Sequence, residues 1–168
     1  MTEFQDVNYW LKPIGTADDN KKCFKNKDFE AFVQMCFEMN ECQFKHKTEQ
    51  IKKGDILICY LSGLQQIIFV SEITEAKNNF KYSEAERRKN PAKKRWPYYA
   101  KVKGIESKGL LLSKNIYLRD LKKNYFNDTE SERFLSLKKD KDFKRIRQRD
   151  RLQLDPDFAA FVLNEIKK

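Results

Sequence analysis

A short basic and aromatic segment carries the clearest binding chemistry of the chain. Lys93, Lys94 and Arg95 come directly before Trp96, and a Pro-Tyr-Tyr sequence follows. Cationic side chains interleaved with flat rings suit a nucleic acid, because the cations contact phosphates while the rings stack on exposed bases. The alternative is a solvated charge run that leads into a core strand with Trp96 packed inside. We favour binding for the cations and leave both roles open for Trp96.

A second candidate site is the break between two apolar segments in the middle of the chain. The sequence KKGD precedes an apolar run from Ile56 to Tyr60, a Ser-Gly pair follows, and a second apolar run extends from Ile67 to Ile73. This order predicts a strand, a polar break and a return strand. Tyr60 and Ser62 would then lie at the mouth between the strands and line a pocket. The alternative is a hairpin corner in which Ser62 forms local hydrogen bonds.

Two further side chains are candidates for a pocket wall. Trp10 fits a pocket wall and a large core residue at the end of a strand equally well. Asn20 has an amide that could read a base edge, although a turn asparagine is the more common role for such a residue. A second cationic cluster extends the basic segment. The predicted phosphate contacts are Arg87, Arg88, Lys93, Lys94 and Arg95.

The composition favours a folded chain with an anionic partner. The 168 residues suit one domain over residues 1–168, because 40% of them are hydrophobic and can form a core. The net charge of +10 favours nucleic acid. Near the C-terminus, aspartates dilute the basic stretch 138–151, so a solvated helix face competes with binding there. No apolar run reaches membrane-spanning length and the first residues lack a signal-peptide pattern, so we expect a cytoplasmic protein without a membrane partner.

Catalytic and metal chemistry has little support in the sequence. His46 is the only histidine, and with Cys42 it could supply half of a metal site that no second pair completes. The four cysteines form no CxxC pair, which favours reduced, structural thiols. Neither a P-loop nor a GxGxxG sequence is present. We therefore expect no enzymatic activity, no metal and no cofactor.

Hydrophobic periodicity and capping residues predict the elements that position these candidates. In the N-terminal half we expect a strand at 7–11 ended by Pro13, a helix capped by Asn26 that ends near Asn40, and a polar connection at 41–50. The segment 75–94 is a long loop or a frayed helix within one. The later elements are a strand at 96–105, a short strand at 110–112, a short helix at 115–123, and a final helix capped by Asp155 and opened by Pro156.

The order of these signals resembles the EVE domain, a branch of the PUA-like superfamily that is related to YTH and ASCH domains. The residues that carry the resemblance are NYWL around Trp10, KKGD, YLSG, IIFVSEI, WPYYAKVKGI and the closing QRDRLQLDPDFAAFVLNEI. The resemblance covers nearly the whole chain. It implies an α+β fold, namely a PUA-like curved antiparallel or mixed β-barrel with flanking helices.

The resemblance also implies a concave pocket that accepts a flipped or unpaired, modified nucleobase from DNA or RNA. The pocket residues would be Trp10, Asn20, Tyr60, Ser62 and Trp96. Our leading hypothesis is therefore a non-catalytic nucleic-acid-binding module. One alternative is a small ASCH-like hydrolase acting on a modified nucleoside through Lys52, Thr74 and Glu75. Another is a protein-interaction or specificity subunit of a defence or restriction system, and a restriction or RNA-processing protein remains open as a further partner.

Overall fold

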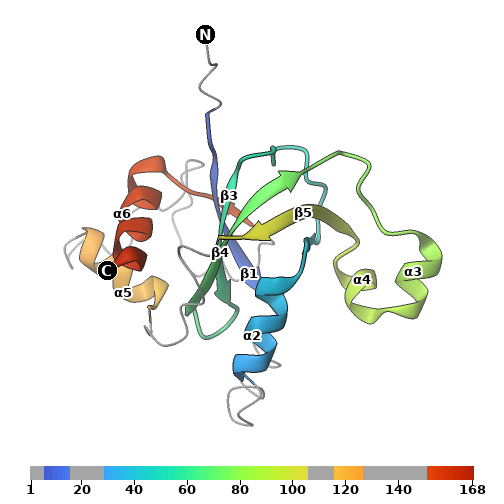
Figure 1. Cartoon of the computed structure of the whole chain (residues 1–168), viewed down its shortest axis with the longest axis horizontal. Coiled ribbons are helices and arrows are strands. Elements are labelled where there is room, and N and C mark those ends of the chain that lie inside the picture. Colours follow the sequence, from blue (N-terminus) through green and yellow to red (C-terminus); the bar gives the residue numbers. More distant parts are fainter. Residues whose placement is uncertain (1–5, 16–28, 106–115, 127–150) are drawn as a thin grey trace.

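The computed structural model describes residues 6–15, 29–105, 116–126 and 151–168, which contain six strands and five helices (Figure 1). None of these helices is both long and apolar enough to cross a membrane. The strands are β1 Tyr9–Ile14, β2 Glu41–Phe44, β3 Ile56–Leu61, β4 Ile67–Glu75, β5 Tyr98–Gly104 and β6 Leu152–Gln153. The helices are α2 Phe29–Glu38, α3 Glu84–Lys89, α4 Pro91–Arg95, α5 Leu118–Phe126 and α6 Pro156–Lys167.

The strands form one mixed, curled sheet in the order β2-β5-β4-β3-β1-β6. Only β1 and β3 run parallel, and every other pairing is antiparallel. The curl brings together strands that are distant in this order. For example, Lys12 Nζ of β1 lies 5.0 Å from the ring centroid of Phe44 on β2. A curled mixed sheet with flanking helices confirms the predicted α+β, PUA-like fold class.

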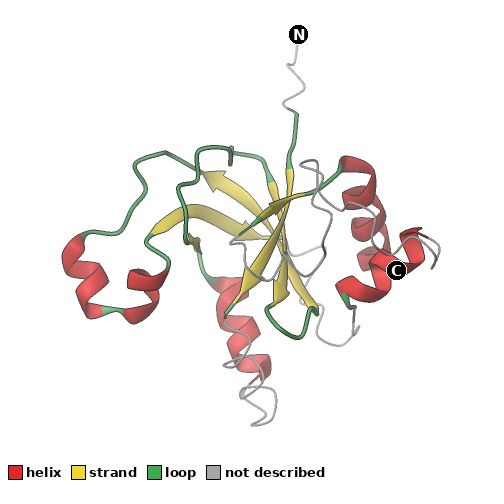
Figure 2. Ribbon diagram, turned by 180° about the vertical axis from the view of Figure 1, so that it is seen from behind, coloured by secondary structure: helices red, strands yellow, loops and turns green. Residues whose placement is uncertain are grey.

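Helices cover both faces of the sheet (Figure 2). On one face, α5 and α6 pack Leu118, Phe158 and Val162 against inward residues of β1, β3 and β4. On the other face, α2 packs Val33 against Leu57, Phe69 and further residues of the central strands. We call these the closed face and the α2 face. Because side chains alternate along a strand, neighbouring residues of β3 contribute to different cores.

The KKGD turn before β3 fixes the start of β1 next to it. Asp55 is buried, and its carboxylate accepts hydrogen bonds from the backbone N–H groups of Asn8 (3.1 Å) and Lys52 (2.9 Å). The same carboxylate accepts a bond of 3.0 Å from Nε1 of Trp10. Gly54 has φ of 91°, a conformation that glycine adopts without strain. The turn therefore joins two sequence motifs through one satisfied buried charge.

Most predicted elements are confirmed. Helix α2 lies within the range predicted after Asn26, β3 and β4 form the predicted strand pair, and β5 occupies most of 96–105. Asp155 caps α6 as predicted, since its Oδ2 accepts from the N–H groups of Asp157 and Phe158, both at 3.1 Å. Helix α5 begins and ends about three residues later than predicted. The short strand predicted at 110–112 and the cap at Asn26 lie outside the described residues.

Three predictions about elements are wrong. Strand β1 continues through Pro13 to Ile14. It pairs with β6 only at Trp10 and Leu11, so a proline beyond that point removes no bond to β6. Residues 41–44 form the edge strand β2 rather than a connection, because Cys42 and Phe44 alternate inward. For residues 75–94 we expected a long loop or a frayed helix within one, but two capped helices, α3 and α4, occupy residues 84–95.

Candidate functional site

The α2 face contains a cavity of about 290 Å³. It lies between the end of β1, helix α2, the edge strand β2, the central strands and the end of α4. Met35 and Met39 of α2 line it and are 54% and 40% exposed, so the cavity reaches the surface beside them. Its lining is Lys12, Pro13, Ile14, Gly15, Phe32, Met35, Cys36, Met39, Glu41, Cys42, Gln43, Leu57, Cys59, Phe69, Ser71, Asn90, Ala92, Trp96 and Val102.

Among the described lining residues are three aromatic rings from different elements: Phe32 of α2, Phe69 of β4 and Trp96 directly after α4. Phe69 is buried and held edge-on by Phe37, with ring centroids 5.8 Å apart. Trp96 is half-buried, and the Arg95 guanidinium lies 5.3 Å from its ring centroid. Flat rings with an opening to the surface are suited to contact a planar guest.

Sulfur atoms form much of the remaining wall. Cys36, Cys42 and Cys59 line the cavity as thiols rather than disulfides. Burial, and next the neighbouring Cys42, raise the pKa of Cys36 to about 11. Burial followed by Cys42 also raises the pKa of Cys59. Both thiols therefore stay protonated at neutral pH, and a protonated thiol is a poor nucleophile.

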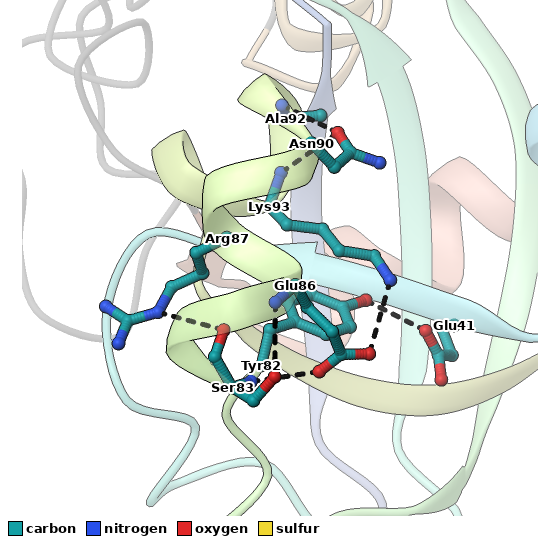
Figure 3. A network of polar contacts seen from close by, with 8 residues as sticks. All are labelled: Glu41, Tyr82, Ser83, Glu86, Arg87, Asn90, Ala92 and Lys93. Atoms are coloured by element: carbon teal, nitrogen blue, oxygen red, sulfur yellow. Dashed lines mark hydrogen bonds and ion pairs between the residues drawn. The ribbon is translucent and has the colours of Figure 1, made fainter.

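A few polar side chains interrupt this apolar lining. Lys12 is only 4% exposed, and its Nζ donates a hydrogen bond of 3.0 Å to the carbonyl of Pro13. On the edge strand β2, the Oε2 atom of Glu41 accepts a hydrogen bond of 2.8 Å from the hydroxyl of Tyr82, as Figure 3 shows. Gln43, Ser71 and Asn90 complete the polar lining. An apolar pocket with a few placed polar groups is typical of a binding site for a small molecule or group.

A helical arm, residues 83–96, carries Trp96 and Asn90 to the cavity. Ser83 and Glu86 form a capping box that starts α3. Asn90 ends α3 and caps α4, accepting from the N–H groups of Ala92 (2.9 Å) and Lys93 (3.4 Å) (Figure 3). Pro91 follows at the first helical position, where its missing N–H costs nothing. These local signals fold the arm as two short helices.

Tyr82 attaches this arm to the sheet. Its ring stacks on Tyr99 of β5, with centroids 4.6 Å apart, and Lys93 Nζ lies 4.5 Å from the Tyr82 ring centroid. Lys93 also forms an ion pair of 3.6 Å with Glu86. The buried ring of Tyr82 thus lies between the Tyr99 ring and the Lys93 ammonium. Both contacts stabilise the attachment of the arm to the sheet.

The residues predicted for the pocket do not all line the cavity. Trp96 lines the cavity. Trp10 and Tyr60 are each only 2% exposed and do not line it; Trp10 lies in the core of the α2 face and Tyr60 in that of the closed face. Ser62 lies in the turn after β3, where its N–H donates to the carbonyl of Ile14 at 3.2 Å. Asn20 lies outside the described residues.

The predicted phosphate contacts all lie on the arm. Lys94 and Arg95 are exposed on α4, next to Trp96. Lys93 is half-buried in the contacts with Tyr82 and Glu86, Arg88 pairs with Glu84, and Arg87 donates to the carbonyl of Ser83 at 3.4 Å. Of this group, Lys94 and Arg95 are therefore the cations that are exposed and lie within two residues of Trp96.

Sequence reasoning missed Phe32, Glu41, Gln43 and Asn90 in the cavity lining. The alternation of Glu41 and Gln43 with two inward apolar residues was a signal of a short strand, and Asn-Pro at residues 90–91 was a signal of a helix start. Phe32 belongs to the apolar stripe of α2, and no local signal distinguishes a ring that packs in a core from one that lines a cavity.

The groups predicted for alternative chemistry do not meet at the cavity. Lys52, Thr74 and Glu75 are absent from its lining, and Glu75 pairs with Lys77 (3.1 Å) and Lys101 (3.3 Å). These contacts, led by the bond to Lys77 and then that to Lys101, lower the pKa of Glu75. His46 is exposed. Within the described ranges, no three or more His, Cys, Asp or Glu side chains are grouped so as to hold a metal ion.

Comparison with known proteins supports the fold. No protein-family model and no curated protein matches the chain. Among solved structures, the Pho92 YTH domain in complex with m6A is 11% identical over 98% of this chain and 85% of its own, with a TM-score of 0.52. Human THYN1 in complex with 5-methylcytosine-containing DNA is 15% identical over 96% and 99%, with a TM-score of 0.53. Atu2648 from Agrobacterium tumefaciens is 12% identical over 95% and 93%, with a TM-score of 0.51.

These similarities establish a fold class rather than an activity. The chain shares its fold with YTH domains and with human THYN1. This agrees with the PUA-like fold that the sequence motifs of the chain predict.

Proposed function

We propose that the chain binds DNA or RNA without catalysis, by holding one modified, flipped or unpaired nucleobase in the cavity of the α2 face. The proposal rests on one observation: a ring-lined cavity opens beside an arm whose exposed cations, Lys94 and Arg95, adjoin the wall residue Trp96. The aromatic rings can stack on a base, and the cations can contact the phosphates of the nucleic-acid strand attached to it.

The size of the cavity fits a single base. Its volume of about 290 Å³ lies just below the ~300–1,000 Å³ found for pockets that bind drug-sized ligands, as suits a smaller guest such as one base. A base that leaves a strand loses its stacking partners at a cost of a few kcal/mol, whereas stacking on an aromatic side chain returns about 1–3 kcal/mol. Contacts to Trp96 and Phe32 can therefore offset much of the cost of extrusion.

Two further observations favour binding over turnover. The fold is shared with structures determined in complex with m6A, with N6-methyladenosine RNA and with 5-methylcytosine-containing DNA. Burial raises the pKa values of the Cys36 and Cys59 thiols, so both stay protonated at neutral pH and are poor nucleophiles. The hydrolase hypothesis has weaker support, because Lys52, Thr74 and Glu75 do not line the cavity. A partner from a restriction or RNA-processing system remains a prediction.

The experiment is a binding titration with short single-stranded oligonucleotides that carry one 5-methylcytosine, one N6-methyladenine or no modification. We expect the wild-type chain to prefer a modified oligonucleotide. Trp96→Ala should weaken that binding roughly 5- to 150-fold, as expected for the loss of one stacked ring. Phe161→Ala, which removes a half-buried ring from the opposite face, is the matched control and should leave affinity unchanged.

Two results would overturn the proposal. One is an affinity of Trp96→Ala equal to that of the wild type, which would show that the base does not bind in the cavity. The other is no affinity for any oligonucleotide at low salt, which would favour the protein-interaction hypothesis instead.

A further inference from the structure

Glu41 gives the cavity a fixed hydrogen-bond acceptor. It is the acidic side chain among the described lining residues, and the Tyr82 hydroxyl donates to its Oε2 atom at 2.8 Å. The Gln43 side chain, two residues along the same strand, lies beside the Tyr82 hydroxyl and acts to lower the pKa of Tyr82. A carboxylate accepts through two oxygens, so the bond from Tyr82 to one of them leaves acceptor capacity at the other.

Tyr82 holds this acceptor in one orientation. Burial first, and then the bond to Glu41, raise the pKa of Tyr82, so its hydroxyl keeps the proton that it donates. Its ring cannot turn freely, because Tyr99 stacks on it at 4.6 Å and the Lys93 ammonium lies 4.5 Å from its centroid. Glu41 therefore keeps a fixed position before a guest arrives, and this preorganisation improves discrimination between guests.

Lys12 supplies the opposite kind of group to the same cavity. Its ammonium is buried, carries three N–H donors, and donates to the carbonyl of Pro13 at 3.0 Å. The residues that line the cavity thus include one with a carboxylate, on β2, and one with an ammonium, on β1. A guest that fits both has an N–H donor on one part of its edge and a lone pair on another.

We propose that Glu41 makes the cavity select nucleobases with an exocyclic amino group, of the adenine and cytosine type, over their carbonyl counterparts. This inference rests on the proposed function, since it requires a base in the cavity. An amino group donates to the carboxylate. A carbonyl oxygen in the same place would set lone pairs against a negative charge and leave the half-buried carboxylate without a second donor.

Matched pairs of bases test this selection. 5-Methylcytosine and thymine share the pyrimidine skeleton and the methyl group; thymine has a carbonyl in place of the amino group and an N–H in place of the adjacent ring lone pair. Adenine and hypoxanthine form the corresponding purine pair. The measurement is the affinity ratio within each pair, with the base placed once in otherwise identical single-stranded oligonucleotides. We expect the wild type to bind the amino member about 10-fold or more tightly, the scale of one good base-edge contact.

Two variants connect the ratio to these residues. Glu41→Gln should bring the ratio close to one, because an amide can donate to a carbonyl as well as accept from an amino group. Tyr82→Phe keeps the ring on Tyr99 but removes the bond that positions Glu41, so the ratio should fall at least threefold while the melting temperature changes little. Glu72→Gln removes an exposed charge from β4 outside the cavity and should leave the ratio at its wild-type value.

The outcomes separate this inference from the function on which it rests. Equal binding of both members of each pair by the wild type, or an unchanged ratio in Glu41→Gln, would overturn the role of Glu41 while base capture remains. No binding of any oligonucleotide would overturn both. A ratio that falls equally in Glu72→Gln would assign the effect to net charge and overturn the assignment to Glu41.

Discussion

The two faces of the sheet use the same strands for different purposes. Along β3, Ile58 and Tyr60 point into the closed face, where α5 and α6 complete the packing. Leu57 and Cys59 point to the α2 face and line the cavity. A large ring thus fills space on one side at the level where a small thiol leaves space on the other. The contrast shows how one strand can carry stability and a binding site in alternate residues.

The helices reinforce this contrast (Figure 1). On the closed face, α6 buries Phe158, Val162 and Ile166 in one continuous stripe. On the α2 face, the exposed thioethers of Met35 and Met39 mark where the cover ends and the cavity opens. Substitutions on the closed face should therefore change stability, and those around the cavity should change binding.

The largest stability effect is expected on the closed face. Tyr60→Ala removes a ring that is 2% exposed, and the cavity it leaves should lower the free energy of unfolding by roughly 3–5 kcal/mol. Cys59→Ala, its neighbour on the other face, removes only a thiol and should cost clearly less. Urea denaturation of both variants measures the difference. Similar losses in both would show that the two faces contribute alike.

A smaller effect is expected where α2 crosses β5. A Cβ atom added at Gly104 would overlap the ring of Phe37 on α2, so Gly104→Ala must displace the helix or the ring. We expect a loss of about 1–3 kcal/mol in unfolding free energy, together with weaker oligonucleotide binding because α2 carries Phe32 and Cys36. Lys103→Ala, on the exposed side of the same strand, is the control for stability. Wild-type stability and affinity in Gly104→Ala would contradict a close contact between α2 and β5.

Local signals in the sequence predict most of the fold. The cap at Asp155 with Pro156 predicts α6, and the two apolar runs around Ser62 predict β3 and β4, because each signal acts within a few residues. The EVE resemblance adds the order of the elements, and the shared fold with YTH domains and THYN1 agrees with it. Strand β2 was missed because four alternating residues are a weak signal, and pairing with β5 is what makes them a strand.

The site depends on contacts that the sequence does not display. Tyr60 and Ser62 are next to a strand break, but which face a strand residue occupies depends on the register, and β3 has an irregularity between Cys59 and Tyr60. Trp10 has the right type for a pocket wall, yet Asp55, far along the chain, binds its N–H within the core. Trp96 lines the cavity because Tyr82 and Tyr99 attach the arm to the sheet.

The smallest expected effect concerns the exposed cations of the arm. Lys94→Ala should leave stability within about 0.5 kcal/mol of the wild type, since the side chain is exposed. It should weaken binding of modified and plain oligonucleotides alike and reduce the slope of log K against log salt by roughly 0.7–0.9, the value for one lost phosphate contact. Lys53→Ala, an exposed lysine in the turn before β3, should keep the wild-type slope. An equal reduction in both variants would mean that the net charge of +10, rather than the arm beside the cavity, attracts the strand.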